Sequence, residues 1–152
     1  SPLAWLAIGI TLGDLPFGRL AGFRAAMGDA FDEDLVEPVP LYAFADGAAG
    51  MERLLERAPD IDGVFAASDA VAAGAMQTLQ AAGRSIPGDV GVVGFDDSSW
   101  ARRTSPNLSS IHQPAEGLGI AAAKAVLAQL EGDQSVRTGI LLDAPVVWRD
   151  SA

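Results

Sequence analysis

Short apolar runs alternate with longer segments of helical periodicity along this chain, and the clearest case lies in residues 61–97. Residues 64–67 form an apolar run, apolar positions then recur at helical spacing as far as Gly83, and residues 90–95 form a second apolar run. A crossover of this length joins parallel strands of one sheet. The pattern therefore predicts a βαβ unit.

Each of the two apolar runs ends in a pair of polar residues. These pairs are Ser68 with Asp69, and Asp96 with Asp97. Because parallel strands end at the same edge of a sheet, the four side chains are predicted to share the carboxyl edge, where open α/β folds bind ligands. Ser68 and Asp69 also suit the start of a helix, so capping is the simpler interpretation of these two.

The same alternation continues on both sides of the unit. Upstream it predicts a strand at 3–11, a helix at 16–31, a solvated acidic connection at 32–37, a strand at 39–44, and a helix at 47–58 capped by Asp46. Downstream it predicts a helical turn at 98–103, a strand at 108–112, a long helix at 115–131, and one or two short strands within 140–148. This order is typical of the α/β class with a doubly wound parallel sheet.

Composition and charge narrow the function. A chain of 152 residues can bury a sizeable core, and ten basic against twenty acidic residues give a formal net charge of −10. That charge repels phosphate backbones, so this segment is not expected to bind nucleic acid. There is no cysteine for disulfides or thiolate chemistry, and the single His112 cannot form a metal cluster. Residues 3–10 lack the basic flank of a signal peptide and are too few to span a bilayer.

Four motifs resemble the effector-binding domain of the LacI/GalR family of bacterial transcriptional regulators. They are RLAGF at 19–23, GVFAASDAVAAGAMQTL at 63–79, IPGDVGVVGFDD at 86–97 and SPNLSSIHQP at 105–114. The resemblance implies a periplasmic-binding-protein-like fold, in which two α/β lobes enclose the effector. Residues 1–110 would form the core of the C-terminal lobe, and residues 111–152 the crossover, long helix and terminal strands. The family's amino-terminal DNA-binding helix-turn-helix has no counterpart in this chain.

The resemblance also implies a ligand-binding wall. It would place Arg19, Asp46, Ser68, Asp69 and Asp96 along the cleft. Carboxylates and an arginine can bind sugar hydroxyls in pairs, while an aromatic ring covers the apolar side of the sugar. A basic residue in the first turn of a helix opposes the helix dipole, which indicates that Arg19 is placed for another reason.

The sequence also contains candidates for the aromatic ring that would cover a sugar. Gly47 and Ala115 stand where relatives often have aromatic rings, so Phe17 and Trp100 are the candidates for stacking. Both could instead belong to local core.

The leading hypothesis is a cytoplasmic, homodimeric regulator that senses a carbohydrate by lobe closure. It would bind DNA only through the missing helix-turn-helix, and it needs neither a membrane nor a cofactor. An exported sugar-binding receptor of the same fold is the alternative, and it requires a signal peptide. A third hypothesis is an enzyme that holds a divalent cation with Asp69, Asp96 and Asp97. No phosphate loop or pair of base and nucleophile accompanies these carboxylates, so no catalytic or metal-binding residue is assigned.

Overall fold

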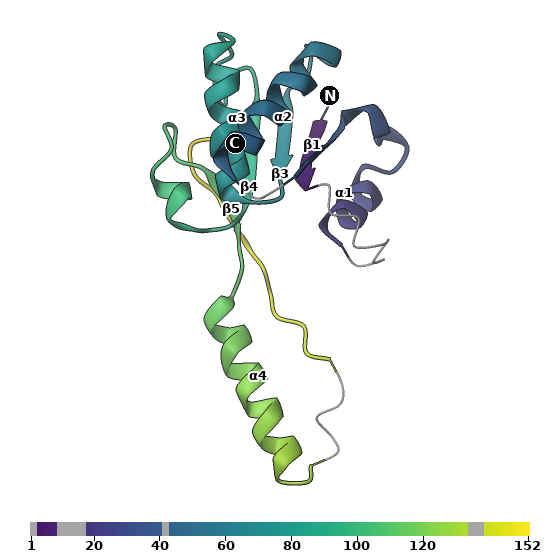
Figure 1. Ribbon diagram of the computed structural model, residues 1–152, viewed down its shortest axis with the longest axis vertical. Helices are drawn as coiled ribbons and strands as arrows, with labels where there is room; N and C mark the ends of the chain where they lie inside the picture. Colours follow the sequence, from purple (N-terminus) through teal and green to yellow (C-terminus); the bar gives the residue numbers. More distant parts are fainter. Residues whose placement is uncertain (1–2, 9–17, 41–42, 134–138) are drawn as a thin grey trace.

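The computed structural model describes residues 3–8, 18–40, 43–133 and 139–152, and it contains a six-stranded sheet in the order β2-β1-β3-β4-β5-β6 (Figure 1). The strands are β1 (Leu3–Ile8), β2 (Val36–Val39), β3 (Gly63–Ala66), β4 (Gly91–Asp96), β5 (Ser109–His112) and β6 (Val146–Val147). The helices are α1 (Arg19–Met27), α2 (Phe44–Arg57), α3 (Asp69–Ala81) and α4 (Ala115–Leu130), with short 3-10 helices η1 (Gly28–Ala30), η2 (Glu33–Leu35) and η3 (Ser99–Arg102).

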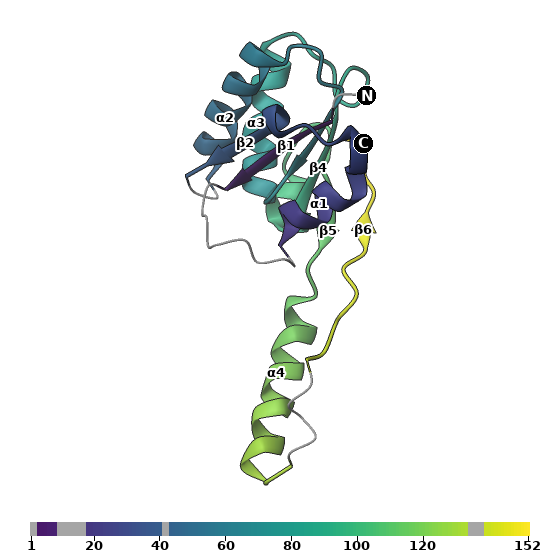
Figure 2. The ribbon, with the colours of Figure 1, turned by 90° about the vertical axis from the view of Figure 1, so that its right-hand side faces the viewer.

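The sheet is parallel from β2 to β5, and only β6 runs antiparallel to its neighbour. The chain steps from β1 to β2 in one direction and from β3 to β4 in the other, so right-handed crossovers place α1 on one face and α2 with α3 on the opposite face (Figure 2). This arrangement confirms the predicted α/β class with its doubly wound, mainly parallel sheet.

Alternate side chains of β3 pack on opposite faces of the sheet. Val64 and Ala66 join the main core beneath α2 and α3, whereas Phe65 packs with Leu20 and Phe23 of α1. The fully buried part of the main core is built from aliphatic side chains and methionine: Met51, Leu54, Ile61, Val71, Leu79, Val90, Val92 and Leu108.

Two glycines allow α2 and α3 to approach each other closely. A Cβ atom added at Gly47 would lie 2.1 Å from the carbonyl oxygen of Val71, and one added at Gly74 would lie 2.0 Å from that of Phe44. Both distances are far below van der Waals contact, so no larger residue fits without moving a helix. The absence of an aromatic side chain at position 47 is therefore a packing requirement.

The structure corrects the predicted second strand. It lies at Val36–Val39, not at 39–44, and α2 begins at Phe44, before Asp46. The strand includes Pro38, which an edge strand tolerates, and it ends before Pro40. Glu37 is buried in this strand, where its carboxylate accepts hydrogen bonds from Arg53 at 2.5 Å and Arg57 at 2.6 Å. The predicted solvated connection at 32–37 is therefore wrong for Val36 and Glu37.

Elsewhere the predicted elements and the observed ones differ mainly at their ends. The first helix is shorter than predicted, since α1 ends at Met27 and η1 follows it. The expected turn, strand and long helix downstream are present as η3, β5 and α4. Predictions for residues 9–17 fall outside the described residues.

Helix α4 projects away from the sheet together with the segment that returns to β6 (Figures 1 and 2). Its large apolar side chains are open to solvent, with exposed fractions of 42% at Leu118, 56% at Val126 and 79% at Leu130. Apolar residues occur on every side of this helix, a composition typical of a helix covered by other protein. None of the helices in the described residues has both the length and the apolarity needed to cross a membrane.

Candidate functional site

Arg19 lies at the carboxyl edge of the sheet, at the first residue of α1. Its Nη1 donates a hydrogen bond to the carbonyl oxygen of Ala67 at 2.6 Å, and its guanidinium carbon lies 3.8 Å from the centroid of the Phe95 ring. The carbonyl and the aromatic face both favour a cation, which accounts for a basic residue at a position unfavourable to the helix dipole. Arg19 is thus held half-buried beside the end of β4.

Asp96 is the last residue of β4 and lies within the electrostatic reach of Arg19. Burial raises the pKa of its carboxyl group, the charge of Arg19 partly lowers it, and the nearby carboxylate of Asp69 raises it. Within the described residues no hydrogen bond reaches this carboxylate. Its backbone has a φ of +109°, unusual for a residue other than glycine. Asp96 is therefore a partly desolvated acceptor to which no described residue donates a hydrogen bond.

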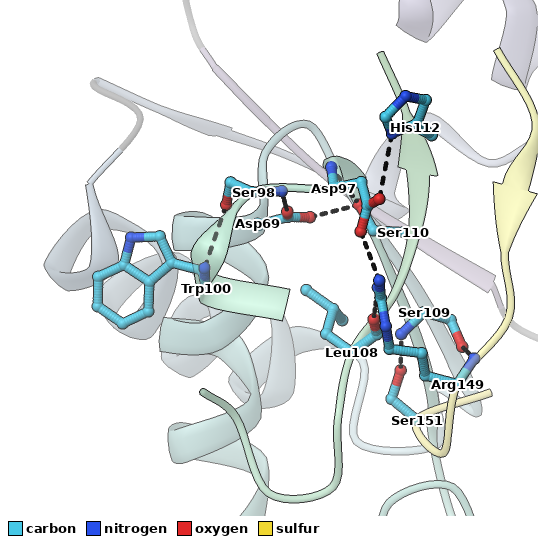
Figure 3. Close-up of polar contacts among 10 residues, drawn as sticks. All are labelled: Asp69, Asp97, Ser98, Trp100, Leu108, Ser109, Ser110, His112, Arg149 and Ser151. Atoms are coloured by element: carbon cyan, nitrogen blue, oxygen red, sulfur yellow. Dashed lines mark hydrogen bonds and ion pairs between the residues drawn. The ribbon is translucent and has the colours of Figure 1, made fainter. Parts of the chain in front are cut away.

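Asp69 has a different environment, because the protein uses both of its oxygens. The buried carboxylate accepts the backbone N–H of Ser98 at 2.6 Å and the hydroxyl of Ser110 at 2.5 Å (Figure 3). Gly94 makes room for it, since a Cβ atom there would lie 2.4 Å from Asp69 Oδ1. Asp69 thus supports the turn that follows β4 from inside the lobe.

Ser68 is the residue that caps α3. Its side-chain oxygen accepts the N–H of Val71 at 3.3 Å, and the residue is buried. This agrees with the simpler interpretation of Ser68 as a cap.

Asp97 continues the turn and has a φ of +53°. Its carboxylate accepts a hydrogen bond from Arg149 Nη2 at 2.6 Å and lies 3.1 Å from Nδ1 of His112 (Figure 3). Burial raises the pKa of Asp97, but hydrogen bonds from Arg149 and His112 outweigh it, and the pKa is lower than the ordinary value. No local pattern pointed to Arg149, which lies 52 residues after Asp97 in the chain.

The lowered pKa of Asp97 predicts a dependence of stability on pH. A carboxylate whose pKa is lower in the folded state stabilises the fold above its unfolded-state value, near 3.8, and this contribution is lost as the pH falls through the folded-state pKa. Asp97→Asn should therefore lower the urea midpoint at pH 7, and the gap to wild type should narrow below pH 4. A gap that stays constant with pH would contradict the assignment of the ion pair.

The remaining predicted residues lie around α2 and η3. Trp100, 38% exposed, stacks on Phe44 with ring centroids 5.6 Å apart and planes inclined by 21°. Asp46 lies in the first turn of α2 and accepts the N–H of Ala43 at 3.3 Å. Among the described residues, no hydrogen bond or ring contact links Asp46 or Trp100 to Asp96. Phe17 lies outside the described residues, and Ala115 is exposed at the start of α4.

The carboxylates do not form a cation cage in the described part of the chain. No three of its His, Cys, Asp or Glu side chains gather in a way that could hold a metal ion. The oxygens of Asp69 and Asp97 already accept protein donors, and Asp96 faces the positive charge of Arg19. This arrangement suits hydroxyl binding better than metal binding.

Comparison with known proteins agrees with this geometry. Residues 14–152 match the periplasmic binding protein-like domain family. The HTH-type transcriptional regulator CelR of Thermobifida fusca is 38% identical over 136 residues, which cover 88% of this chain and 40% of CelR. The ribose operon repressor of Haemophilus influenzae is 32% identical, over 95% of this chain and 45% of the repressor. The chain thus spans less than half the length of either relative.

Solved structures give the same result for the fold. A complex of transcriptional regulator CelR with cellobiose superimposes with a TM-score of 0.88 at 35% identity, covering 99% of this chain and 46% of that chain. The Escherichia coli transcriptional repressor AscG superimposes with a TM-score of 0.85 at 32% identity, covering 99% and 55%. Sequence and fold together show that this chain belongs to the periplasmic-binding-protein-like domains of LacI-family transcriptional regulators.

Proposed function

We propose that this chain is the C-terminal lobe of a sugar-sensing domain, and that Arg19 and Asp96 bind hydroxyl groups of a carbohydrate effector. The observation that carries the proposal is the pairing of an anchored guanidinium with a half-buried carboxylate that has no donor among the described residues. Neighbouring hydroxyls of a sugar can donate to the carboxylate and accept from the guanidinium. Hydrogen bonds to charged groups are about twice as strong as neutral ones.

Ser68 and Asp69 have an indirect role in this proposal. Their oxygens accept hydrogen bonds from Val71, Ser98 and Ser110. These bonds fix the loop that contains Ala67, whose carbonyl oxygen binds Arg19, and the turn that contains Asp96. We propose that the sugar also contacts Asp46 and the stacked rings of Phe44 and Trp100. An amphipathic ring is a common cover for the apolar face of a sugar.

The domain organisation follows from α4. Its exposed apolar surface, together with that of the returning segment, is proposed to be covered by a second α/β lobe. Residues 1–110 would then be the core of one lobe and residues 111–152 the connection to the other. The effector would bind between the lobes and favour a closed arrangement.

In the whole protein, we propose that lobe closure controls DNA binding by a separate helix-turn-helix in a cytoplasmic homodimer. The relatives described above are regulators and repressors, which supports this hypothesis over an exported receptor and over an enzyme. The net charge of −10 repels the phosphate backbone of DNA, which supports the proposal that another part of the protein contacts DNA.

The test is isothermal titration calorimetry of the protein, in its full encoded length, with cellobiose, ribose and lactose. Cellobiose is the first probe because it is bound in the CelR complex. We expect at least one sugar to bind saturably and to raise the melting temperature, since a ligand that binds only the folded state stabilises it. Absence of binding to every member of a broad mono- and disaccharide panel would contradict the proposal.

A further inference from the structure

Two chain segments connect the lobe to α4, and one carboxylate holds both of them. The outgoing segment leaves β5 at His112, whose Nδ1 lies 3.1 Å from Asp97 Oδ2. The returning segment carries Arg149, whose Nη2 donates to Asp97 Oδ1 at 2.6 Å. Figure 3 shows the Asp97 carboxylate between these two side chains.

Arg149 also binds β5 directly, which links the two segments to each other. Its Nη1 donates to the carbonyl oxygen of Leu108 at 2.8 Å, and its backbone N–H donates to Ser109 Oγ at 2.8 Å. The His112 N–H donates to the carbonyl oxygen of Pro145 at 2.8 Å. A displacement of one segment at the lobe surface therefore displaces the other.

Asp97 is also joined directly, by a peptide bond, to Asp96, the proposed sugar ligand. Both residues have positive φ, at +109° and +53°, a costly conformation that residues other than glycine keep only where the surrounding structure holds them. The turn is held from inside the lobe, where Asp97 N–H donates to Ser110 Oγ at 3.0 Å and Ser98 N–H donates to Asp69. These contacts leave the turn little freedom, so we expect a rotation at Asp96 to change the orientation of Asp97 as well.

We infer that Asp97 is a positioning residue that couples the sugar-binding carboxylate of Asp96 to both segments that lead to α4. The inference rests on the proposed function, because it requires a ligand at Asp96. A sugar that fixes the orientation of Asp96 also fixes Asp97, and Asp97 then holds Arg149 and His112 in one arrangement. Sugar binding and the arrangement of the two segments are thereby linked, and thermodynamic linkage acts equally in both directions.

The experiment is hydrogen–deuterium exchange of the full-length encoded protein, with and without saturating cellobiose. In the wild type we expect cellobiose to slow exchange in residues 112–115 and 143–147 together.

The variants test the role of Asp97. Asp97→Asn and Arg149→Gln should lose more than half of this slowing at saturation, while Arg149→Lys should retain most of it. His112→Gln, a change at an exposed side chain, should lose the slowing mainly in residues 112–115. Arg103→Gln, which removes an exposed arginine from a nearby loop, is the matched control.

The outcomes separate the inference from the proposed function. If the Asp97 and Arg149 variants bind cellobiose and slow exchange in both segments as much as wild type does, the inference is wrong. If the wild type binds no sugar, the proposed function fails, and the comparison is made without ligand. In that case, faster exchange of both segments in Asp97→Asn than in the wild type supports the inference that Asp97 holds both segments. An unchanged exchange rate in either segment overturns that inference.

Discussion

Replacing Asp96 by Asn is expected to abolish sugar binding while leaving the folded chain at least as stable as wild type. Burial is the main cause of the raised pKa of Asp96, so the unliganded fold bears the cost of a charge without a hydrogen-bond donor among the described residues. Asparagine removes that charge and tolerates positive φ. Two charge-assisted hydrogen bonds to a sugar would be weakened, which predicts an affinity loss of about 100-fold or more.

The sign of the pH effect follows from the same pKa. A carboxyl group whose pKa is raised on folding favours the folded state below its unfolded-state value and loses that contribution as the pH rises through the raised value. The stability gain of Asp96→Asn should therefore be present at pH 7 and disappear at low pH.

Calorimetry with the best sugar of the panel and urea denaturation measure the two halves of the Asp96 prediction. Arg19→Gln should also abolish binding, because the guanidinium is the other half of the proposed site. Asp62→Asn is the control, since Asp62 is exposed and precedes β3 at the amino edge of the sheet. Normal affinity in both Asp96→Asn and Arg19→Gln would show that the sugar binds elsewhere.

The second large effect is expected on stability. Gly74→Ala places a methyl group 2.0 Å from the carbonyl oxygen of Phe44, and a backbone oxygen at the start of α2 cannot yield as a flexible side chain would. Helix α2 must move away from α3, which opens the main core. We expect a loss of about 3 kcal/mol or more in the free energy of unfolding.

The control for this substitution is Gly22→Ala in α1. Gly22 is exposed, and no atom lies within 4 Å of the position of an added Cβ. Alanine is the better helix former, so this change should stabilise the protein by roughly 0.5–1 kcal/mol. Urea denaturation of both variants at pH 7 measures the difference. A loss below about 1 kcal/mol for Gly74→Ala would contradict the close packing of the two helices.

The part of the fold that local patterns encode could be predicted from the sequence. The unit from β3 to β4 was predictable because an apolar run, a serine cap and a glycine after the helix are all local signals. The common edge for Arg19 and Asp96 followed from parallel strands and from the motifs. The roles of these two residues in ligand binding stay predictions.

The features that escaped prediction depend on partners distant in sequence. Glu37 looks like part of an acidic loop until Arg53 and Arg57 are placed over it by α2. Asp97 has no visible partner until Arg149 returns to the lobe. The pairing of Trp100 with Phe44 likewise needs α2 and η3 in their positions, and no local pattern contains that information.

The pairing of β5 with β6 has a consequence for the order of folding. Ser110 pairs with Val147 across an excursion that includes the whole of α4, whereas β3 and β4 are joined by one helix. Closing a longer loop costs more entropy and slows the formation of its contacts. We expect the sheet to form first from β2 to β5 and the last edge strand to dock afterwards. Because Arg149 arrives with that strand, Asp97 gains its partner only in the final stage of assembly.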